Sequence, residues 1–287
     1  MLWIAHSSTY EDARVYQLAQ ILTALRESIH ELEFFYTSLS RKDIPKLEPN
    51  IPHPRFFPYP NSFLERNKEV LFNYVKPLED NATCVAFLAQ TEDGSQVVVK
   101  FVDRYGSAVH EFLAKLGYAP GLRYCGPLSL PQPAQPLLLS KPGLSLGRLQ
   151  MVVMDYVEPL SQDLPQAAHL QIVQILNTLH QNGYVFGDLR RPNIILNQAK
   201  KIQLIDFDWA GRYDTSFQDD IPDDIRKLIP AEVLKPTNVI QAQTDTTFAH
   251  YPLNLSKNLF SSTGANDLQP IRPIHDWVML NKLTFTH

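Results

Sequence analysis

The sequence predicts an α+β fold in which a β-rich part precedes a part with a longer helix. Two apolar runs, Cys84–Gln90 and Gln96–Val102, are separated by polar residues that include Asp93-Gly94, a dipeptide typical of a β-hairpin turn. Apolar side chains then recur at helical spacing over Ala167–Gln181, and Gly183 follows as a C-terminal stop.

Other segments complete this order. We expect a helix over Ser107–Leu116, a strand over Leu149–Val157, and a second hairpin formed by Asn193–Leu196 and Ile202–Phe207. The order from residue 84 on is therefore strand, strand, helix, strand, helix and hairpin.

The first 60 residues follow a different pattern. Apolar residues recur at helical spacing from Tyr10 to about Leu39, which predicts one long amphipathic helix. Residues 44–60 contain six prolines, which exclude a regular helix or a central strand there. We expect this segment to be an irregular connector.

Composition and net charge indicate which partners, metal sites and cellular location to expect. The 287 residues are enough for one large domain or two lobes, and the net charge of −4 gives no basic field, so nucleic acid is not expected as a partner. Cys84 and Cys125 are too few for a disulfide framework or a zinc site. No signal peptide or membrane-spanning run is evident, so we expect an intracellular protein, cytoplasmic or nuclear, with no membrane contact.

Lys100 is the first candidate site residue. It lies in a strongly apolar strand, Val97–Val102, and a Lys on a buried strand needs a nearby anion to offset its desolvation. We expect that anion to be a nucleotide phosphate. Glu111, the only acid in the following helix, is expected to hold the ammonium in place.

Three further polar residues follow in an order that suits phosphoryl transfer. Asp188 and Asn193 are separated by four residues in a loop between a helix and a strand, and Asp206 ends the second hairpin. Phosphoryl transfer needs a cation on the phosphates, oxygen ligands for magnesium and a carboxylate near the attacking hydroxyl. These residue types supply all three.

These motifs resemble those of known kinases. Gly187-Asp188-Leu189-Arg190-Arg191-Pro192-Asn193 resembles the catalytic loop of protein kinases and of aminoglycoside and choline phosphotransferases, and Ile205-Asp206-Phe207-Asp208 resembles their metal-binding motif. The tail, with His250–Asn254 and Ile274–Leu280, resembles that of fungal kinase-like and crinkler-associated proteins. The main resemblance covers about residues 73–212.

The resemblance implies a fold and a domain division. The fold would be the two-lobed protein-kinase-like fold, with a small β-rich N-lobe and a mostly helical, shortened C-lobe. Residues 1–72 would be an N-terminal helix and Pro-rich extension, 73–157 the N-lobe and hinge, and 158–287 the C-lobe. Asp276 would brace the catalytic loop from a helix near the C-terminus.

The resemblance also assigns roles to particular residues. The catalytic residues would be Asp188 as base, with Arg190, Lys100 and Glu111. Residues that bind ATP would be Lys100, Met154, Asp155 and Val157. The Mg²⁺ ligands would be Asn193, Asp206 and Asp208.

Two departures from the kinase pattern keep alternatives open. Gly187-Asp188-Leu189 and Asp208 are closer to the small-molecule kinases. No glycine stands in Pro77–Thr83, where a Gly-rich phosphate loop would be expected, so phosphate binding by backbone amides is weakened.

The expected function is an ATP- and Mg²⁺-dependent kinase that phosphorylates a hydroxyl group, on a protein Ser or Thr. One alternative is a small-molecule kinase of the aminoglycoside or choline phosphotransferase type. The other is a pseudokinase that acts as a nucleotide- or protein-binding module. The expected partners are ATP and a protein substrate.

Overall fold

The computed structural model describes residues 8–38, 57–79, 85–128, 149–161, 163–215, 227, 248–253, 255 and 265–286. By its internal contacts the chain forms two compact units, Met1–Phe56 and Phe57–His287. The described part of the first unit is a single helix, and all other described elements belong to the second.

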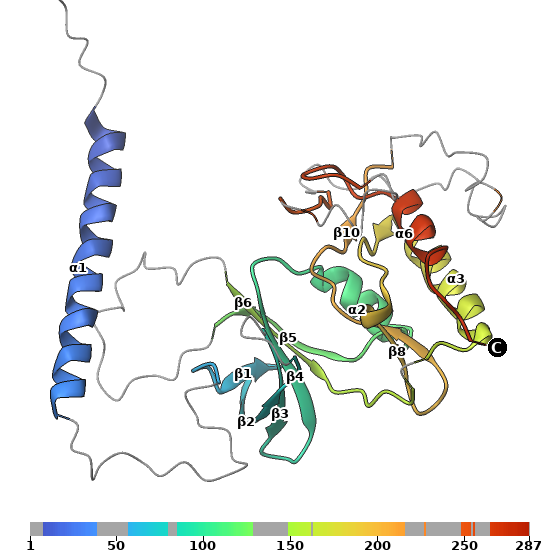
Figure 1. Cartoon of the computed structure of the whole chain (residues 1–287), viewed down its shortest axis with the longest axis horizontal. Coiled ribbons are helices and arrows are strands. Elements are labelled where there is room, and N and C mark those ends of the chain that lie inside the picture. The colour runs from blue at the N-terminus through green and yellow to red at the C-terminus, as the bar shows by residue number, and fades with distance from the viewer. Residues whose placement is uncertain are drawn as a thin grey trace, which may run out of the picture. The chain divides into compact units, whose positions relative to one another are not determined.

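Helix α1 (Ser8–Ser38) is the described part of the first unit (Figure 1). It confirms the long helix predicted over residues 10–39. From Val15 onward all of its side chains are exposed, the apolar ones included. Residues 44–56 of the predicted Pro-rich connector lie outside the described residues.

Six strands form one antiparallel sheet in the second unit (Figure 1). In chain order they are β1 (Ser62–Glu65), β2 (Lys68–Pro77), β3 (Ala86–Thr91), β4 (Gln96–Val102), β5 (Leu122–Pro127) and β6 (Gln150–Asp155). Their order across the sheet is β1-β2-β3-β4-β6-β5. The edge strands β1 and β5 also contact each other, so the sheet curls into a nearly closed, barrel-like form.

The two faces of this sheet differ. Val97, Val99 and Phe101 of β4 lie on a fully apolar face. They pack with Phe63, Phe72, Phe87, Ala89, Met151 and Val153. Because side chains alternate along a strand, Lys100 falls on the other face, paired with Ala86 of β3 and Val152 of β6.

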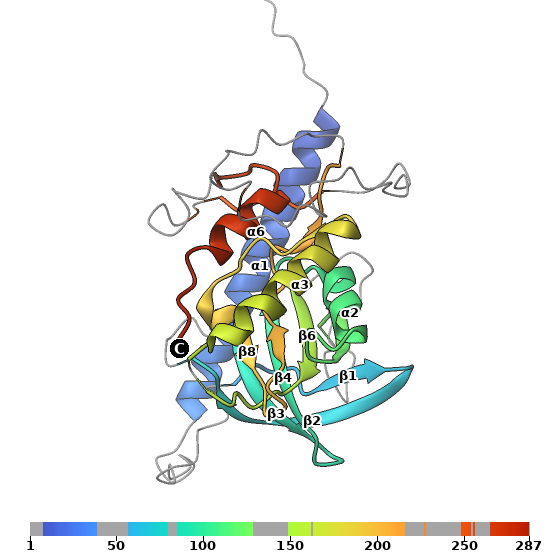
Figure 2. The ribbon, with the colours of Figure 1, turned by 90° about the vertical axis from the view of Figure 1, so that its right-hand side faces the viewer.

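Among the residues that the structure describes, three α-helices, the short 3-10 helix η3 (Arg191–Asn193) and two ribbons complete the second unit. The helices are α2 (Ser107–Lys115), α3 (Gln166–Gln181) and α6 (Pro273–Leu280), and α3 and α6 lie side by side (Figure 2). The two-stranded ribbons are β7 (Tyr184–Val185) with β10 (Gly211–Arg212), and β8 (Ile194–Leu196) with β9 (Ile202–Leu204). Leu113, Ile175, Phe186, Phe207 and Trp277 are among the buried side chains that these elements share as a second core.

The two-lobed protein-kinase-like fold implied by the resemblance is wrong. The main feature of the structure is the nearly closed antiparallel sheet, and the described residues after it contain two α-helices, α3 and α6, among short ribbons and irregular segments. A mostly helical C-lobe is not what these residues form. The motifs that carried the resemblance determine the conformation of two loops, and such loops do not require a helical lobe around them.

Several single elements agree with the sequence predictions. The hairpin β3–β4, helices α2 and α3, strand β6 and the ribbon β8–β9 all lie where they were expected. Strands β1 and β2, which the sequence analysis did not assign, add to the sheet, and β2 runs across the predicted domain boundary between residues 72 and 73. Cys125 is a free thiol, as expected, and Cys84 lies outside the described residues.

Candidate active site

Lys100 is the cationic centre of the site. Its strand is apolar and its side chain is only 10% exposed, so the charge needs a partner inside the protein. The ammonium Nζ donates to Asp206 Oδ1 at 2.6 Å and to Asp208 Oδ1 at 2.7 Å. Lys100 and Asp206 are therefore in direct contact, although 106 residues separate them in the chain.

The loop after β9 positions both carboxylates. Asp206 has a left-handed backbone (φ 68°), which non-glycine residues rarely adopt. Phe207 between the two acids is fully buried and stacks on His110 of α2 at a centroid distance of 4.5 Å. Its carbonyl accepts a hydrogen bond from Gly106 N–H (2.8 Å), so the loop is fixed to the start of α2.

Gly106 is needed for this attachment. A Cβ at this position would lie 2.4 Å from the carbonyl oxygen of Ala210, closer than real contacts allow. Arg104 adds a second link, since its Nε donates to the Asp208 carbonyl at 3.1 Å. The segment before α2 therefore holds the Asp206–Asp208 loop through backbone contacts.

Asp188 lies in the loop after β7 and is 4% exposed. Arg190 Nε and Nη2 donate to its two oxygens at 2.5 and 2.6 Å, and Asn193 Nδ2 donates to Oδ2 at 2.9 Å. Asn193 Nδ2 also donates to the Asp188 carbonyl, at 2.9 Å. The loop thus brings Asp188, Arg190 and Asn193 together.

The two loops are neighbours. Ile205 N–H donates to the carbonyl of Asn193 at 3.0 Å, next to the β8–β9 ribbon, so Asp206 directly follows the contact with the Asp188 loop. The charge of Asp206 also acts on both Asp188 and Arg190. Lys100, Asp188, Asn193, Asp206 and Asp208 therefore form one polar group beside the sheet.

Asp276 of α6 holds the Asp188 loop in place through hydrogen bonds. Its carboxylate is fully buried and accepts hydrogen bonds from Phe186 N–H (3.0 Å), Gly187 N–H (2.7 Å) and His180 Nε2 (3.0 Å). Gly187 has φ 82°, and a Cβ there would lie 3.0 Å from Ile271. The bracing role predicted for Asp276 is confirmed.

Burial and neighbouring charges shift the pKa values of these groups. Burial lowers the pKa of Lys100, but the charges of Asp206 and Asp208 outweigh it and leave the pKa above its ordinary value. Burial, with Asp206 nearby, raises the pKa of Asp208 to about 6 despite the opposing effect of Lys100. Burial also raises the pKa of Asp188, although its hydrogen bonds from Arg190 and Asn193 act in the opposite direction.

The oxygen donors that the site could offer a metal ion are carboxylates and an amide, the types of ligand that suit Mg²⁺. The described part of the chain holds no group of three or more His, Cys, Asp or Glu arranged for a metal. Mg²⁺ usually takes one or two carboxylates and completes its shell with water and substrate phosphates. Asp206 Oδ1 and Asp208 Oδ1 both contact Lys100 Nζ, and Asn193 belongs to the neighbouring loop, so these three residues would hold the ion.

Glu111 does not join the site. It is exposed on α2 and forms no ion pair with Lys100, whose ammonium contacts Asp206 and Asp208 instead. The expectation that Glu111 holds Lys100 is therefore wrong in this structure. The reason is that two carboxylates from the loop after β9 already satisfy the buried ammonium.

The residues expected to bind the nucleotide base lie on and after β6. Met154 is 4% exposed and lies on the same face of the sheet as Lys100, in a small apolar cluster with Val102 and Val152. The carboxylate of Asp155 is bound by Arg123 Nε at 2.6 Å, so its side chain has a structural partner. Val157 is half-buried just beyond the strand.

Sequence reasoning missed the residues that support the site from α2. Arg104, Gly106 and His110 carry no recognisable motif, and their position just before or within the predicted helix was the only available signal. His110 is fully buried, its Nδ1 accepts from the Tyr105 hydroxyl (2.7 Å) and its Nε2 donates to the Pro120 carbonyl (2.8 Å).

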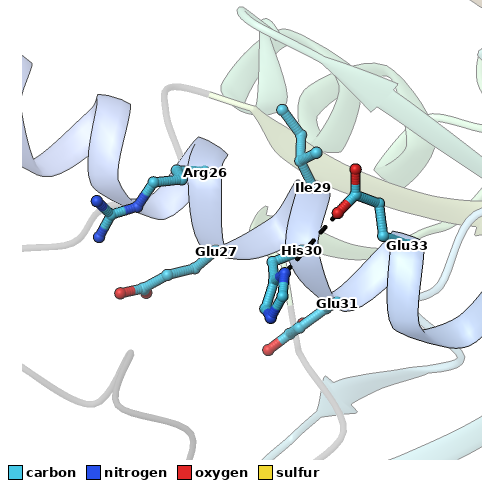
Figure 3. A pocket seen from close by; sticks show the side chains of 6 residues that line it. All are labelled: Arg26, Glu27, Ile29, His30, Glu31 and Glu33. Carbon is cyan, nitrogen blue, oxygen red and sulfur yellow. Dashed lines mark ion pairs between the residues drawn. The ribbon is translucent and has the colours of Figure 1, made fainter.

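A hollow beside α1 is separate from this chemistry. Its described lining residues all belong to that one helix: Arg26, Glu27, Ile29, His30, Glu31 and Glu33 (Figure 3). The interaction drawn among them is an ion pair between exposed His30 and Glu33 at 3.8 Å. These side chains project around the helix rather than converging, so the hollow has no features of an active site.

Comparison with known proteins assigns no family. No protein-family model matches the chain, and no curated protein matches it in sequence. Any statement about function therefore depends on the chemistry of the site. Among the described helices, none combines the length and the apolar character needed to cross a lipid bilayer.

Proposed function

We propose that this protein binds ATP with Mg²⁺ and transfers the γ-phosphoryl group to a hydroxyl group, with a protein Ser or Thr as acceptor. The observation that carries the proposal is the contact of Lys100 Nζ with both Asp206 and Asp208, next to the loop of Asp188 and Asn193. A buried cation, two converging carboxylates and a separate buried carboxylate are the groups that phosphoryl transfer requires.

Lys100 and its surroundings suit a nucleotide. Its ammonium can donate to phosphate oxygens, and the apolar residues on the same face of the sheet, with Met154, can contact the adenine base. Val157 and the backbone at Asp155 follow at the end of β6, where they can contact the base edge. Mg²⁺ bound by Asp206, Asp208 and Asn193 would neutralise charge on the phosphates.

Asp188 is the proposed general base. It would accept the proton of the attacking hydroxyl, and burial, which raises its pKa above that of an ordinary aspartate, makes it a stronger base. Arg190 contacts both carboxylate oxygens and can also donate to the phosphoryl group being transferred. Asp276 positions this loop through backbone hydrogen bonds.

A binding module without catalysis is the second candidate. Both oxygens of Asp188 accept hydrogen bonds from Arg190, and Asn193 adds a third. If these bonds persist with nucleotide bound, Asp188 cannot take up a proton, and the protein would bind ATP without turning it over.

The test is Mg²⁺-dependent ATP turnover and autophosphorylation by the full chain. Asp188→Ala and Lys100→Met should each lower kcat/KM by at least about 100-fold. Lys115→Met, an exposed lysine at the end of α2, is the matched control and should retain wild-type activity. Equal turnover by wild type and Asp188→Ala would refute catalysis by this site, and ATP binding without turnover would favour the binding module.

The acceptor needs its own experiment. Transfer of labelled phosphate from ATP to a mixture of proteins should exceed transfer to a mixture of hydroxyl-bearing metabolites. The reverse result would show that the acceptor is a small molecule.

A further inference from the structure

The described side chains of α1 include an apolar row that the proposed active site does not use. Its members recur alternately three and four residues apart, and each is between 49% and 68% exposed. They are Val15, Leu18, Leu22, Leu25, Ile29, Leu32 and Tyr36. This row, the α1 stripe, runs along one side of the helix.

The spacing of the stripe is that of a coiled coil. A repeat of seven residues with apolar positions a and d forms a seam that pairs with another helix. With Val15 at position a, the d positions within the stripe are all Leu, namely Leu18, Leu25 and Leu32. Two of the a positions, Val15 and Ile29, are β-branched, and β-branched residues at a with Leu at d favour parallel two-stranded coiled coils.

The residues at the e and g positions, which flank the seam, are compatible with a parallel pair of identical helices. In such a pair each g residue faces the e residue five positions further along the other helix. This places Ile21 opposite Arg26, and Ser28 opposite Glu33. No like charges face each other, and Ile21 can cover the aliphatic stem of Arg26.

The exposed area is large enough for a stable pair. Each stripe residue exposes roughly 100 Å² of apolar surface, so two stripes of seven residues would bury roughly 1,400 Å², within the range of about 1,200–2,000 Å² for stable protein interfaces. The stripe covers 22 residues, about 33 Å of helix, and a second α1 matches this length along its whole course.

We infer that α1 forms a parallel two-stranded coiled coil with α1 of a second copy of this chain. The heptad spacing, the choice of a and d residues and the matching length all favour an identical helix as the occupant. This inference does not depend on the proposed phosphoryl transfer, because no residue of the active site lies in α1.

The oligomeric state of the full chain tests the inference. Light scattering after size exclusion should give twice the chain mass of 32.8 kDa. Leu25→Asp would bury an unpaired charge in the seam and should weaken dimerisation at least about 100-fold. Phe34→Asp, at an exposed f position of the same helix, is the matched control and should remain dimeric.

Two results would contradict the inferred dimer. One is a wild-type chain that stays monomeric at the highest concentration reached, which would mean that the stripe is covered by its own chain or by another protein. The other is a dimer that Leu25→Asp leaves intact. Leu25→Ala, which keeps a good helix former, should give a smaller loss in the same direction and separates loss of the seam from misfolding.

Cross-linking tests the parallel orientation. In a parallel pair two copies of position 22 face each other across the seam, so Leu22→Cys should form a disulfide-linked dimer under mild oxidation. Phe34→Cys and the wild type, which carries Cys84 and Cys125, are the controls. Neither should form a disulfide-linked dimer. Failure of Leu22→Cys to cross-link a dimeric protein would overturn the parallel arrangement.

Discussion

His110 shows how one buried side chain links α2 to the loop of Asp206 and Asp208. It stacks on Phe207 between the two acidic residues, and its ring nitrogens bond to Tyr105 and Pro120. Burial lowers its pKa to about 4, so it stays neutral at pH values where a free histidine is protonated. The neutral ring is therefore part of the support for Asp206 and Asp208.

Stability should fall in mild acid because of His110. The unfolded chain protonates this histidine near pH 6.5 and the folded chain only near pH 4, so the unfolded state binds more protons between these values. The free energy of unfolding should drop by up to about 3 kcal/mol as the pH falls from 6.5 to 4. Urea unfolding of wild type and His110→Phe at pH 7 and pH 5 measures this, and an identical pH dependence in both proteins would refute it.

Glu111 provides a second prediction at a single residue. The kinase-like motifs suggested that it holds Lys100, whereas the structure leaves it exposed and pairs Lys100 with two aspartates. Glu111→Gln should therefore change ATP turnover by less than about two-fold, because exposed charges away from a site contribute little. Steady-state ATP turnover of Glu111→Gln and Lys100→Met measures this. A comparable loss of turnover in both variants would show that Glu111 belongs to the site.

Elements with a local signal were predictable from the sequence, and elements without one were not. The β3–β4 hairpin was recognised through Asp93-Gly94, and α3 through its apolar periodicity. The β1–β2 hairpin was missed because Arg66 and Asn67 form its turn with φ of 51° and 65°. Two-residue hairpin turns with positive φ usually contain glycine, so this dipeptide gave no turn signal.

Besides the buried apolar side chains of α6, its Asp276 should contribute to stability. Removing its carboxylate leaves the buried amides of Phe186 and Gly187 without their acceptor. Asp276→Ala should therefore lower the free energy of unfolding by about 3 kcal/mol or more, measured by urea denaturation. Glu158→Ala, an exposed acid after β6, should have no measurable effect, and equal midpoints for the two variants would contradict the bracing role.

At the scale of the whole molecule, the grouping of the candidate site residues was more predictable than the fold around them. Lys100 lies within β4, Asp188 follows β7, Asn193 precedes β8 and Asp206 follows β9. The contacts between Lys100 and Asp206 and between Asn193 and Ile205 bring them into one polar group. The closure of the sheet depends on contact between β1 and β5, about 60 residues apart in sequence, for which no residue pattern gives a signal. Motif spacing therefore indicated which side chains lie together and misled about the surrounding fold.

Ligand binding should stabilise the whole second unit, since its site joins β4, the loop after β7 and the loop after β9. A ligand that binds only the folded chain adds about 2.7 kcal/mol at 100 times its Kd, which corresponds to a rise in Tm of about 5–10 °C for a unit of this size. We expect this rise with ATP and Mg²⁺ together and a smaller one with ATP alone, because Asp206 and Asp208 need the cation to approach phosphates. Asp206→Asn should abolish the Mg²⁺-dependent part in thermal unfolding of the full chain, whereas Glu158→Gln should retain it. A shift that is the same with and without Mg²⁺ in wild type would mean that the two aspartates serve only as partners of Lys100.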